Sequence, residues 1–164
     1  MGGLIDFERE ARWLRAIARS NEDPIPRSLA LCVCLGEQAS RRLLERLHRE
    51  IELLSPLLAR DREVVRLSLV GGTARGLSAE QRHDLDRALR QNFCLAAAVT
   101  AETALPVAPA SAKSSPAVDV LGLGPGTISR VGNLIAHNAP TLDDYCSALD
   151  AGHLPVIRCT TAPP

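Results

Sequence analysis

Three groups of residues have types and spacings that could support chemistry. The first is the segment 122–127, Gly-Leu-Gly-Pro-Gly-Thr, which contains the Gly-x-Gly of dinucleotide-binding loops. Glycines there let the backbone approach a pyrophosphate at a helix N-terminus. A complete site also needs a further glycine, a following helix and a later acidic residue, and Pro125 with the β-branched Thr127 and Ile128 disfavours an immediate helix. A structural turn is therefore the first interpretation, and nucleotide binding the second.

The second group is the cysteines. Cys32 and Cys34 are two apart in an apolar segment, so a strand would point both thiols to one face. Zinc and iron-sulfur sites need three or four ligands, and the remaining cysteines form no second pair; they are Cys94, Cys146 and Cys159. We interpret the thiols as small buried side chains. Their odd number and irregular spacing, without an export signal, predict reduced thiols and a cytoplasmic protein.

The third group is a glycine pair, Gly71-Gly72, which follows the apolar segment 64–70. Glycines at a strand exit permit tight turning or the close approach of backbone to a ligand. The histidines, by contrast, are scattered on or beside polar segments, which favours surface positions over ligand or base roles; they are His48, His83, His137 and His153. No Ser-His-Asp order and no paired carboxylates stand out.

Short elements that alternate along the chain would have to position these groups. Apolar spacing predicts helices over residues 6–20 and 44–58, and Ser78 with Gln81 forms a capping box that begins a third helix bearing Leu85 and Leu89. Apolar runs between turn signals predict strands over 28–35, 64–70 and 94–101. This alternation indicates parallel strands joined by right-handed crossovers, and therefore an α/β fold. Because a closed eight-unit barrel needs at least about 200 residues, we expect an open partial (β/α) barrel.

The remaining sequence divides the chain into three parts. Residues 1–102 form the partial barrel, and 103–118 have the Pro/Ala/Ser composition of a linker. Residues 119–164 form a short α+β C-terminal segment. In it, 119–129 is a glycine-rich loop, Thr141 with Asp144 caps a helix that Gly152 closes, and 160–164 is a frayed tail.

Charge and hydropathy exclude several classes of partner. The chain has 19 basic and 19 acidic residues and no strongly basic segment, so we expect neither nucleic acid nor acidic lipid to bind. No stretch of 18 apolar residues occurs, which predicts that the chain does not span a membrane.

Several segments, taken in order, resemble the radical-SAM coproporphyrinogen III dehydrogenases, the oxygen-independent enzymes of haem biosynthesis. They are Leu-Ser-Leu-Val-Gly-Gly-Thr at 67–73, Arg-Gln-Asn-Phe at 90–93, Val-Leu-Gly-Leu-Gly at 120–124, Ile128-Ser129, Asn138 and Tyr145. The resemblance covers 7–102 and 119–159, with a middle part of the family's barrel replaced by the linker. It implies that the S-adenosylmethionine-binding residues correspond to Gly71, Gly72, Thr73, Glu102, Gly122 and Gly124.

Departures from the family pattern point away from catalysis. The family holds a [4Fe-4S] cluster with Cys-x3-Cys-x2-Cys, but the corresponding loop is deleted between Leu35 and Gln38, and Cys32 and Cys34 precede it. A family tyrosine corresponds to Ala30, and the third glycine of the Gly-Gly-Gly run corresponds to Val70. Without three thiolates the radical chemistry is lost. We therefore expect no catalytic residue, no [4Fe-4S] cluster and no other bound cofactor, and S-adenosylmethionine is the cofactor that could still bind.

Three hypotheses follow for this truncated relative. It is a binding or interaction protein connected to porphyrin biosynthesis by descent, or it remains an oxidoreductase with a cluster rebuilt between subunits from Cys32, Cys34 and one more thiol. The third hypothesis is a structural role, in which the leucine ridge of residues 44–58 mediates homo-oligomerisation. In each case a second copy or a partner protein could cover the open sheet edge.

Overall fold

The computed structural model describes residues 7–22, 28–35, 40–70, 77–96, 101–104 and 119–161. These residues form one sheet and four α-helices. In chain order the elements are α1 (Phe7–Glu22), β1 (Leu29–Cys34), α2 (Arg41–Leu54), the 3-10 helix η1 (Ser55–Leu57), β2 (Glu63–Val70), α3 (Ala79–Asn92), β3 (Cys94–Leu95), β4 (Ala101–Ala104), β5 (Asp119–Leu123), β6 (Ile128–Val131), β7 (Leu134–Asn138), α4 (Leu142–Asp150) and β8 (Val156–Thr161).

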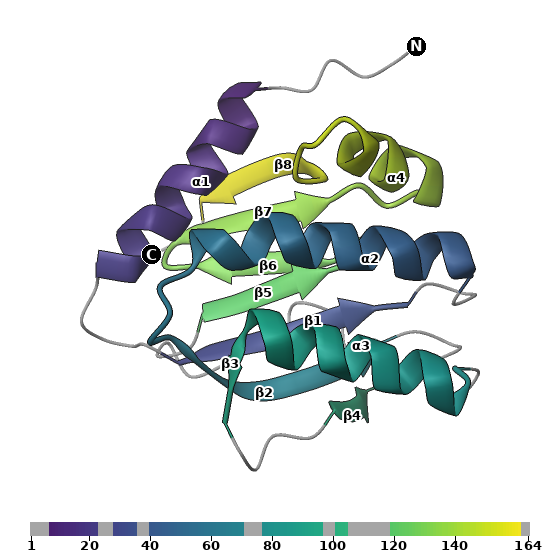
Figure 1. The fold of residues 1–164 in the computed structure, drawn as a ribbon. Coiled ribbons are helices and arrows are strands. Elements are labelled where there is room, and N and C mark those ends of the chain that lie inside the picture. Colours follow the sequence, from purple (N-terminus) through teal and green to yellow (C-terminus); the bar gives the residue numbers. More distant parts are fainter. Residues whose placement is uncertain are drawn as a thin grey trace.

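The sheet combines a parallel half with an antiparallel half. Its strand order is β3-β2-β1-β5-β6-β7-β8, and β4 also pairs with β2. The pairs among β1 to β5 are parallel, whereas β6, β7 and β8 follow one another in antiparallel pairs. Because β8 and the β3–β4 side lie at opposite edges, the sheet is not closed into a barrel (Figure 1). The predicted open α/β fold is confirmed.

All four helices cover one face of the sheet (Figure 1). On β1 the residues of that face, Leu29, Leu31 and Val33, are almost fully buried, whereas Cys32 and Cys34 on the other face are half-buried. The ridge of α2 faces the same core through Leu43, Leu47, Ile51 and Leu54. The leucine ridge of residues 44–58 is thus largely a core face of this chain.

The caps of α3 and α4 are those that the sequence predicts. The Ser78 hydroxyl accepts from the Gln81 backbone N–H, and the Gln81 side chain accepts from the Ser78 N–H, which completes the capping box. The Thr141 hydroxyl accepts from the Asp144 N–H at the start of α4, and Gly152 follows that helix with a positive φ of 80°. These signals are local and were readable without tertiary contacts.

Three predicted segments differ from the structure. The strand expected over 94–101 is two short strands: β2 advances three residues between Val64 and Leu67, but its partner advances six between Leu95 and Ala101. The register on β2 therefore does not continue unbroken from β3 to β4. The glycine-rich loop expected over 119–129 is largely the β5–β6 hairpin, since both flanks pair with other strands.

The third difference is the tail. Thr160 and Thr161, expected to fray, pair with Ile135 and Leu134 as part of β8. Antiparallel pairing with β7 provides the backbone partners that a free terminus lacks. No helix in the described ranges is long and apolar enough to cross a membrane.

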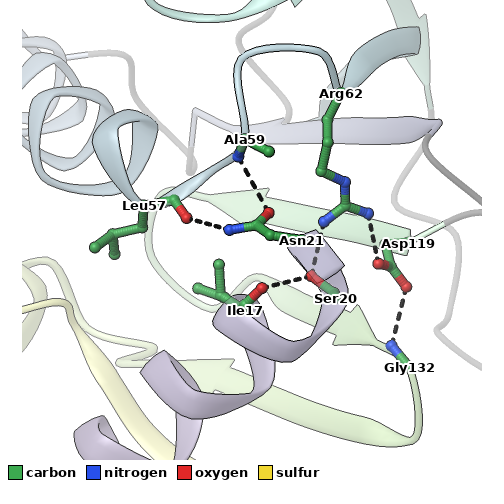
Figure 2. A network of polar contacts seen from close by, with 8 residues as sticks. All are labelled: Ile17, Ser20, Asn21, Leu57, Ala59, Arg62, Asp119 and Gly132. Carbon is green, nitrogen blue, oxygen red and sulfur yellow. Dashed lines mark hydrogen bonds and ion pairs between the residues drawn. The ribbon is translucent and has the colours of Figure 1, made fainter. Parts of the chain in front are cut away.

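A buried ion pair fastens the amino ends of the parallel strands (Figure 2). Arg62, just before β2, donates to Asp119 at the start of β5 over 2.7 Å and to the Ser20 hydroxyl of α1 over 2.7 Å. Asp119 also accepts from the Gly132 N–H in the β6–β7 turn at 2.9 Å. Beside it, the Asn21 side chain bonds the backbone on either side of Leu58, donating to Leu57 and accepting from Ala59. This network ties α1, β2 and β5 together.

Candidate functional site

The carboxyl ends of the parallel strands meet at one edge of the sheet. Cys34 at the end of β1 is in register with Val70 at the end of β2, and Val70 is in register with Ala104 at the end of β4. Leu123, the last residue of β5, pairs with Val33. Ligands of open α/β sheets bind beyond the carboxyl ends of the strands, so this edge is the candidate site.

Two of the predicted site residues share one cross-strand row beside this edge. Glu102 of β4 pairs with Ser68, Ser68 pairs with Cys32, and Cys32 pairs with Gly122 of β5. The strand predicted over 94–101 places Glu102 just after its end, but Glu102 lies two residues before the end of β4, which continues to Ala104. Gly71, Gly72 and Thr73 follow β2 directly and lie outside the described residues.

Packing explains the glycines at 122 and 124. A Cβ at position 122 would lie 2.6 Å from the Thr127 Cβ, and one at position 124 would lie 2.3 Å from the Cys34 carbonyl oxygen. Gly124 also has a φ of +104°, which side chains rarely adopt. The turn between β5 and β6 therefore crosses the end of β1 only because position 124 lacks a side chain. The cofactor-binding role of the two glycines stays a prediction.

A buried carboxyl lies under this turn. Glu50 of α2 accepts hydrogen bonds from the Tyr145 hydroxyl at 2.6 Å, the Gly124 N–H at 2.8 Å and the Asn138 amide at 2.9 Å. Asn138 donates also to the Gly124 carbonyl and to the Thr127 hydroxyl oxygen, and the Thr127 hydroxyl donates to the same carbonyl. The backbone N–H and the carbonyl of Gly124 therefore both have hydrogen-bond partners inside the protein.

Burial dominates the electrostatics of this cluster. Glu50 is only 2% exposed, and burial raises its pKa to about 7, although its three hydrogen bonds favour the ionised form and lower the pKa. Burial and the nearby Glu50 carboxyl raise the pKa of Tyr145. The phenol therefore keeps its proton and acts as a donor to Glu50. The cluster can hold the β5–β6 turn and α4 in place; its partners are all internal groups.

Sequence reasoning missed Glu50 as the centre of this cluster. Its signal was present, because Glu50 falls three residues after Leu47 and four before Leu54, on the apolar face of α2. A charged residue on such a face needs buried partners. Asn138 and Tyr145 were noted as parts of the resemblance, but their shared partner was not.

The thiols do not fit an iron-sulfur cluster. Cys32 and Cys34 lie within β1 between β2 and β5, and burial, with Cys34 nearby, raises the pKa of the Cys32 thiol, which favours its protonated form. The other cysteines lie on separate elements, namely Cys94 on β3, Cys146 on α4 and Cys159 on β8. In the part of the chain that the structure describes, no three His, Cys, Asp or Glu residues are grouped to hold a metal. A [4Fe-4S] cluster needs three thiolates together.

The elements around this edge define an open partial (β/α) barrel, and comparison with known proteins gives it a counterpart. No protein-family model matches the chain, and no curated protein is significantly similar to it in sequence. Among solved structures, the chain is similar to coproporphyrinogen III oxidase (HemN) from Escherichia coli, which is described as a radical SAM enzyme. The similarity has a TM-score of 0.75 at 15% identity and covers 94% of this chain and 75% of that chain. The two chains therefore share a fold.

Proposed function

We propose that this chain is a relative of the radical-SAM coproporphyrinogen III dehydrogenases that lacks the iron-sulfur cluster and acts as a binding or interaction protein. The distribution of the cysteines carries the proposal. Cys32 and Cys34 are strand residues, Cys94 begins β3 at the opposite end of β2, and Cys146 and Cys159 lie on α4 and β8. No three of these thiols could meet around one cluster within a single copy, and without a cluster no electron reaches S-adenosylmethionine.

Two features support descent from that family. The fold is similar to that of HemN. In addition, the residues of the C-terminal segment that carry the sequence resemblance, Asn138 and Tyr145, contact one buried glutamate beneath the Gly122–Gly124 segment. An enzyme that had lost its cofactor would keep such a packed group of residues, because the contacts around Glu50 stabilise the fold.

Metal analysis tests the loss of the cluster. The chain is purified without oxygen, incubated with iron and sulfide under reducing conditions, and freed of excess reagents. We expect a colourless protein with no stoichiometric iron. Close to four irons per chain, with an absorption band lost in a Cys32→Ser, Cys34→Ser variant, would overturn the proposal and favour a cluster rebuilt between subunits. A Cys94→Ser variant is the matched control for a thiol far from that edge.

S-adenosylmethionine is the ligand that we propose for the carboxyl edge of the strands, near Gly71, Gly72 and Thr73. A ligand that binds only the folded state raises the unfolding midpoint, by about 2.7 kcal/mol of stability at a hundredfold excess over its Kd. We expect this shift in the wild-type chain and its loss in a Gly71→Val, Gly72→Val variant. An unchanged midpoint at millimolar S-adenosylmethionine would mean that the glycines only turn the chain.

A further inference from the structure

The face of the sheet opposite the helices, which we call the open face, has no described element on it (Figure 1). Its residues alternate with those of the core: Ala30 and Cys32 lie on it in β1, whereas Leu29, Leu31 and Val33 belong to the core. The centre of this face is made of small residues, namely Ala30, Cys32, Ser68 and Gly122.

Strand register places arginines on both sides of this centre. Arg66 of β2 pairs with Ala30, Ala30 pairs with Val120 of β5, and Val120 pairs with Arg130 of β6. Arg66 and Arg130 are therefore in one row on the open face, and both side chains are exposed. The residues before and after Arg130, Ser129 and Val131, are buried on the helix side.

A third arginine lies further along the same face. Arg158 of β8 is exposed and pairs with His137 of β7, which in turn pairs with Ile128. Burial and the Arg158 charge lower the pKa of His137, so its imidazole stays neutral at pH 7. Arg158 is consequently the cation at this edge of the face.

The arginines of the open face differ from those of α2 in their partners. On α2, arginines pair with carboxylates of α4: Arg42 with Asp143 at 2.8 Å, and Arg46 with Asp150 at 2.8 Å. Among the described residues, Arg66, Arg130 and Arg158 have no ion-pair partner. Of the carboxylates on the neighbouring strands, Asp119 pairs with Arg62, Glu63 lies at the amino end of β2, and Glu102 of β4 is in register with Ser68 of the open face. The three arginines of the open face therefore lack a carboxylate partner within the described chain.

The spacing of these arginines suits a protein surface better than a small anion. Strands are spaced by about 4.8 Å, so Arg66 and Arg130, three strands apart, are separated by roughly 14 Å, and Arg66 and Arg158 by roughly 24 Å. Apolar residues lie between them, including Val120, Ile128 and Ile135. Apolar centres with arginines around them are typical of protein interfaces.

The same charges disfavour two other occupants. A symmetric dimer through the open face would bring the arginines of both copies into one interface, and this concentration of like charge costs free energy. Bound single-stranded nucleic acid needs aromatic platforms, and none of the four aromatic residues belongs to a strand; Phe7 and Trp13 are in α1, Phe93 follows α3, and Tyr145 is in α4.

We propose that the open face binds an acidic surface of a different protein, whose carboxylates pair with Arg66, Arg130 and Arg158. The inference rests on the proposed function only in that the chain acts by binding rather than by catalysis. Carboxylates would provide the partners that these arginines lack within the described chain, and the apolar residues between them would be removed from water.

Binding of fluorescein-labelled poly-L-glutamate, followed by anisotropy at low salt, tests the chemistry of this face. We expect a combined Arg66→Gln, Arg130→Gln, Arg158→Gln variant to bind roughly tenfold more weakly than wild type, since exposed pairs each contribute a modest free energy. The matched control removes the same charge from the helices through Arg15→Gln, Arg19→Gln and Arg87→Gln. It should bind like wild type, and far-ultraviolet circular dichroism checks that both variants fold.

Three results would overturn the inference. Equal weakening in both triple variants would mean that diffuse charge, not the open face, attracts the polyanion. Displacement of poly-L-glutamate by an equal concentration of carboxylate groups supplied as citrate would indicate a small-anion site. Light scattering that reports a dimer, abolished only by the open-face variant, would assign the face to a second copy. Each result is independent of the iron content, so the proposed function and this inference can fail separately.

Discussion

At the scale of single residues, Glu50 is a buried carboxyl that is 2% exposed. It is a carboxyl without a nearby cation among its hydrogen-bond partners, which are a phenol, an amide side chain and a backbone N–H. Hydrogen bonds from neutral groups only partly replace water around a charge. Its ionisation in the folded protein is therefore opposed by burial, and this has a consequence for stability.

The stability contributed by Glu50 should depend on pH. The carboxyl ionises near its ordinary pKa of 4.5 when unfolded and near 7 when folded. A group whose pKa is raised by folding stabilises fully below the unfolded pKa, and the effect is lost as pH rises through the folded pKa. We expect the wild-type free energy of unfolding to fall between pH 4.5 and 7, by up to a few kcal/mol at about 1.4 kcal/mol per pKa unit.

Urea unfolding of wild type and Glu50→Gln across this range isolates the effect. The amide does not titrate, so the advantage of wild type over the variant should be largest near pH 4.5 and shrink toward pH 7. Glu52→Gln, on the exposed side of the same helix, is the control and should show no such trend. A wild-type advantage that stays constant from pH 4.5 to 7 would contradict the assignment.

At the scale of elements, the β5–β6 turn joins the parallel and antiparallel halves of the sheet. It passes so close to the end of β1 that the Cys34 carbonyl occupies the space of a Cβ at position 124. The same turn receives Glu50 from α2 and Asn138 from β7. Its shape is therefore set by three other elements, and the glycine at 124 is what lets them meet.

Two glycine substitutions separate the free-energy cost of a left-handed backbone conformation from the cost of a clash with the end of β1. Gly132 has a φ of +58° with open space around its Cβ position, so Gly132→Ala should cost roughly 1–2 kcal/mol for the left-handed conformation alone. Gly124→Ala adds a clash with backbone, worth roughly 1–3 kcal/mol more. Chemical denaturation should rank Gly124→Ala as clearly the less stable variant. Equal losses would show that the turn moves away from β1 without penalty.

At the scale of the whole molecule, two polar clusters hold opposite ends of the parallel strands. Glu50 holds the carboxyl ends, and the Arg62–Asp119 pair holds the amino ends together with α1 (Figure 2). The Arg62 side chain is 1% exposed, and its Nε has no partner among the described residues. Removing one partner of such a pair destabilises the fold more than removing both charges does.

A single and a double variant of the Arg62–Asp119 pair test how strongly an unpaired buried charge destabilises the fold. Arg62→Met leaves the Asp119 carboxylate buried without its cation and should cost about 3–5 kcal/mol. Adding Asp119→Asn removes the stranded charge but keeps an oxygen for the Gly132 N–H, so the double variant should be more stable than Arg62→Met. Thermal or urea unfolding measures both. A double variant less stable than Arg62→Met would mean that the carboxylate itself stabilises the fold without the arginine.

Local patterns predicted much of the fold. The caps at Ser78 and Thr141, the apolar face of α2 and the buried strand at 28–35 were all predicted, because each depends on residues within a few positions of one another. The division of the strand at 94–101 was not, since it follows from the register against β2. Nor was the Glu50 cluster, whose members Glu50 and Tyr145 are 95 positions apart.

The sequence by itself determined the alternating elements, their caps, and a set of five cysteines without the spacing of the cluster motif of the family it resembles. Only the tertiary structure decided that Glu50, Asn138 and Tyr145 meet under one turn, and that Arg66, Arg130 and Arg158 share the face of the sheet opposite the helices. The physical reason is that periodicity reports which side of an element faces the core, whereas strand order and register decide which distant side chains become neighbours.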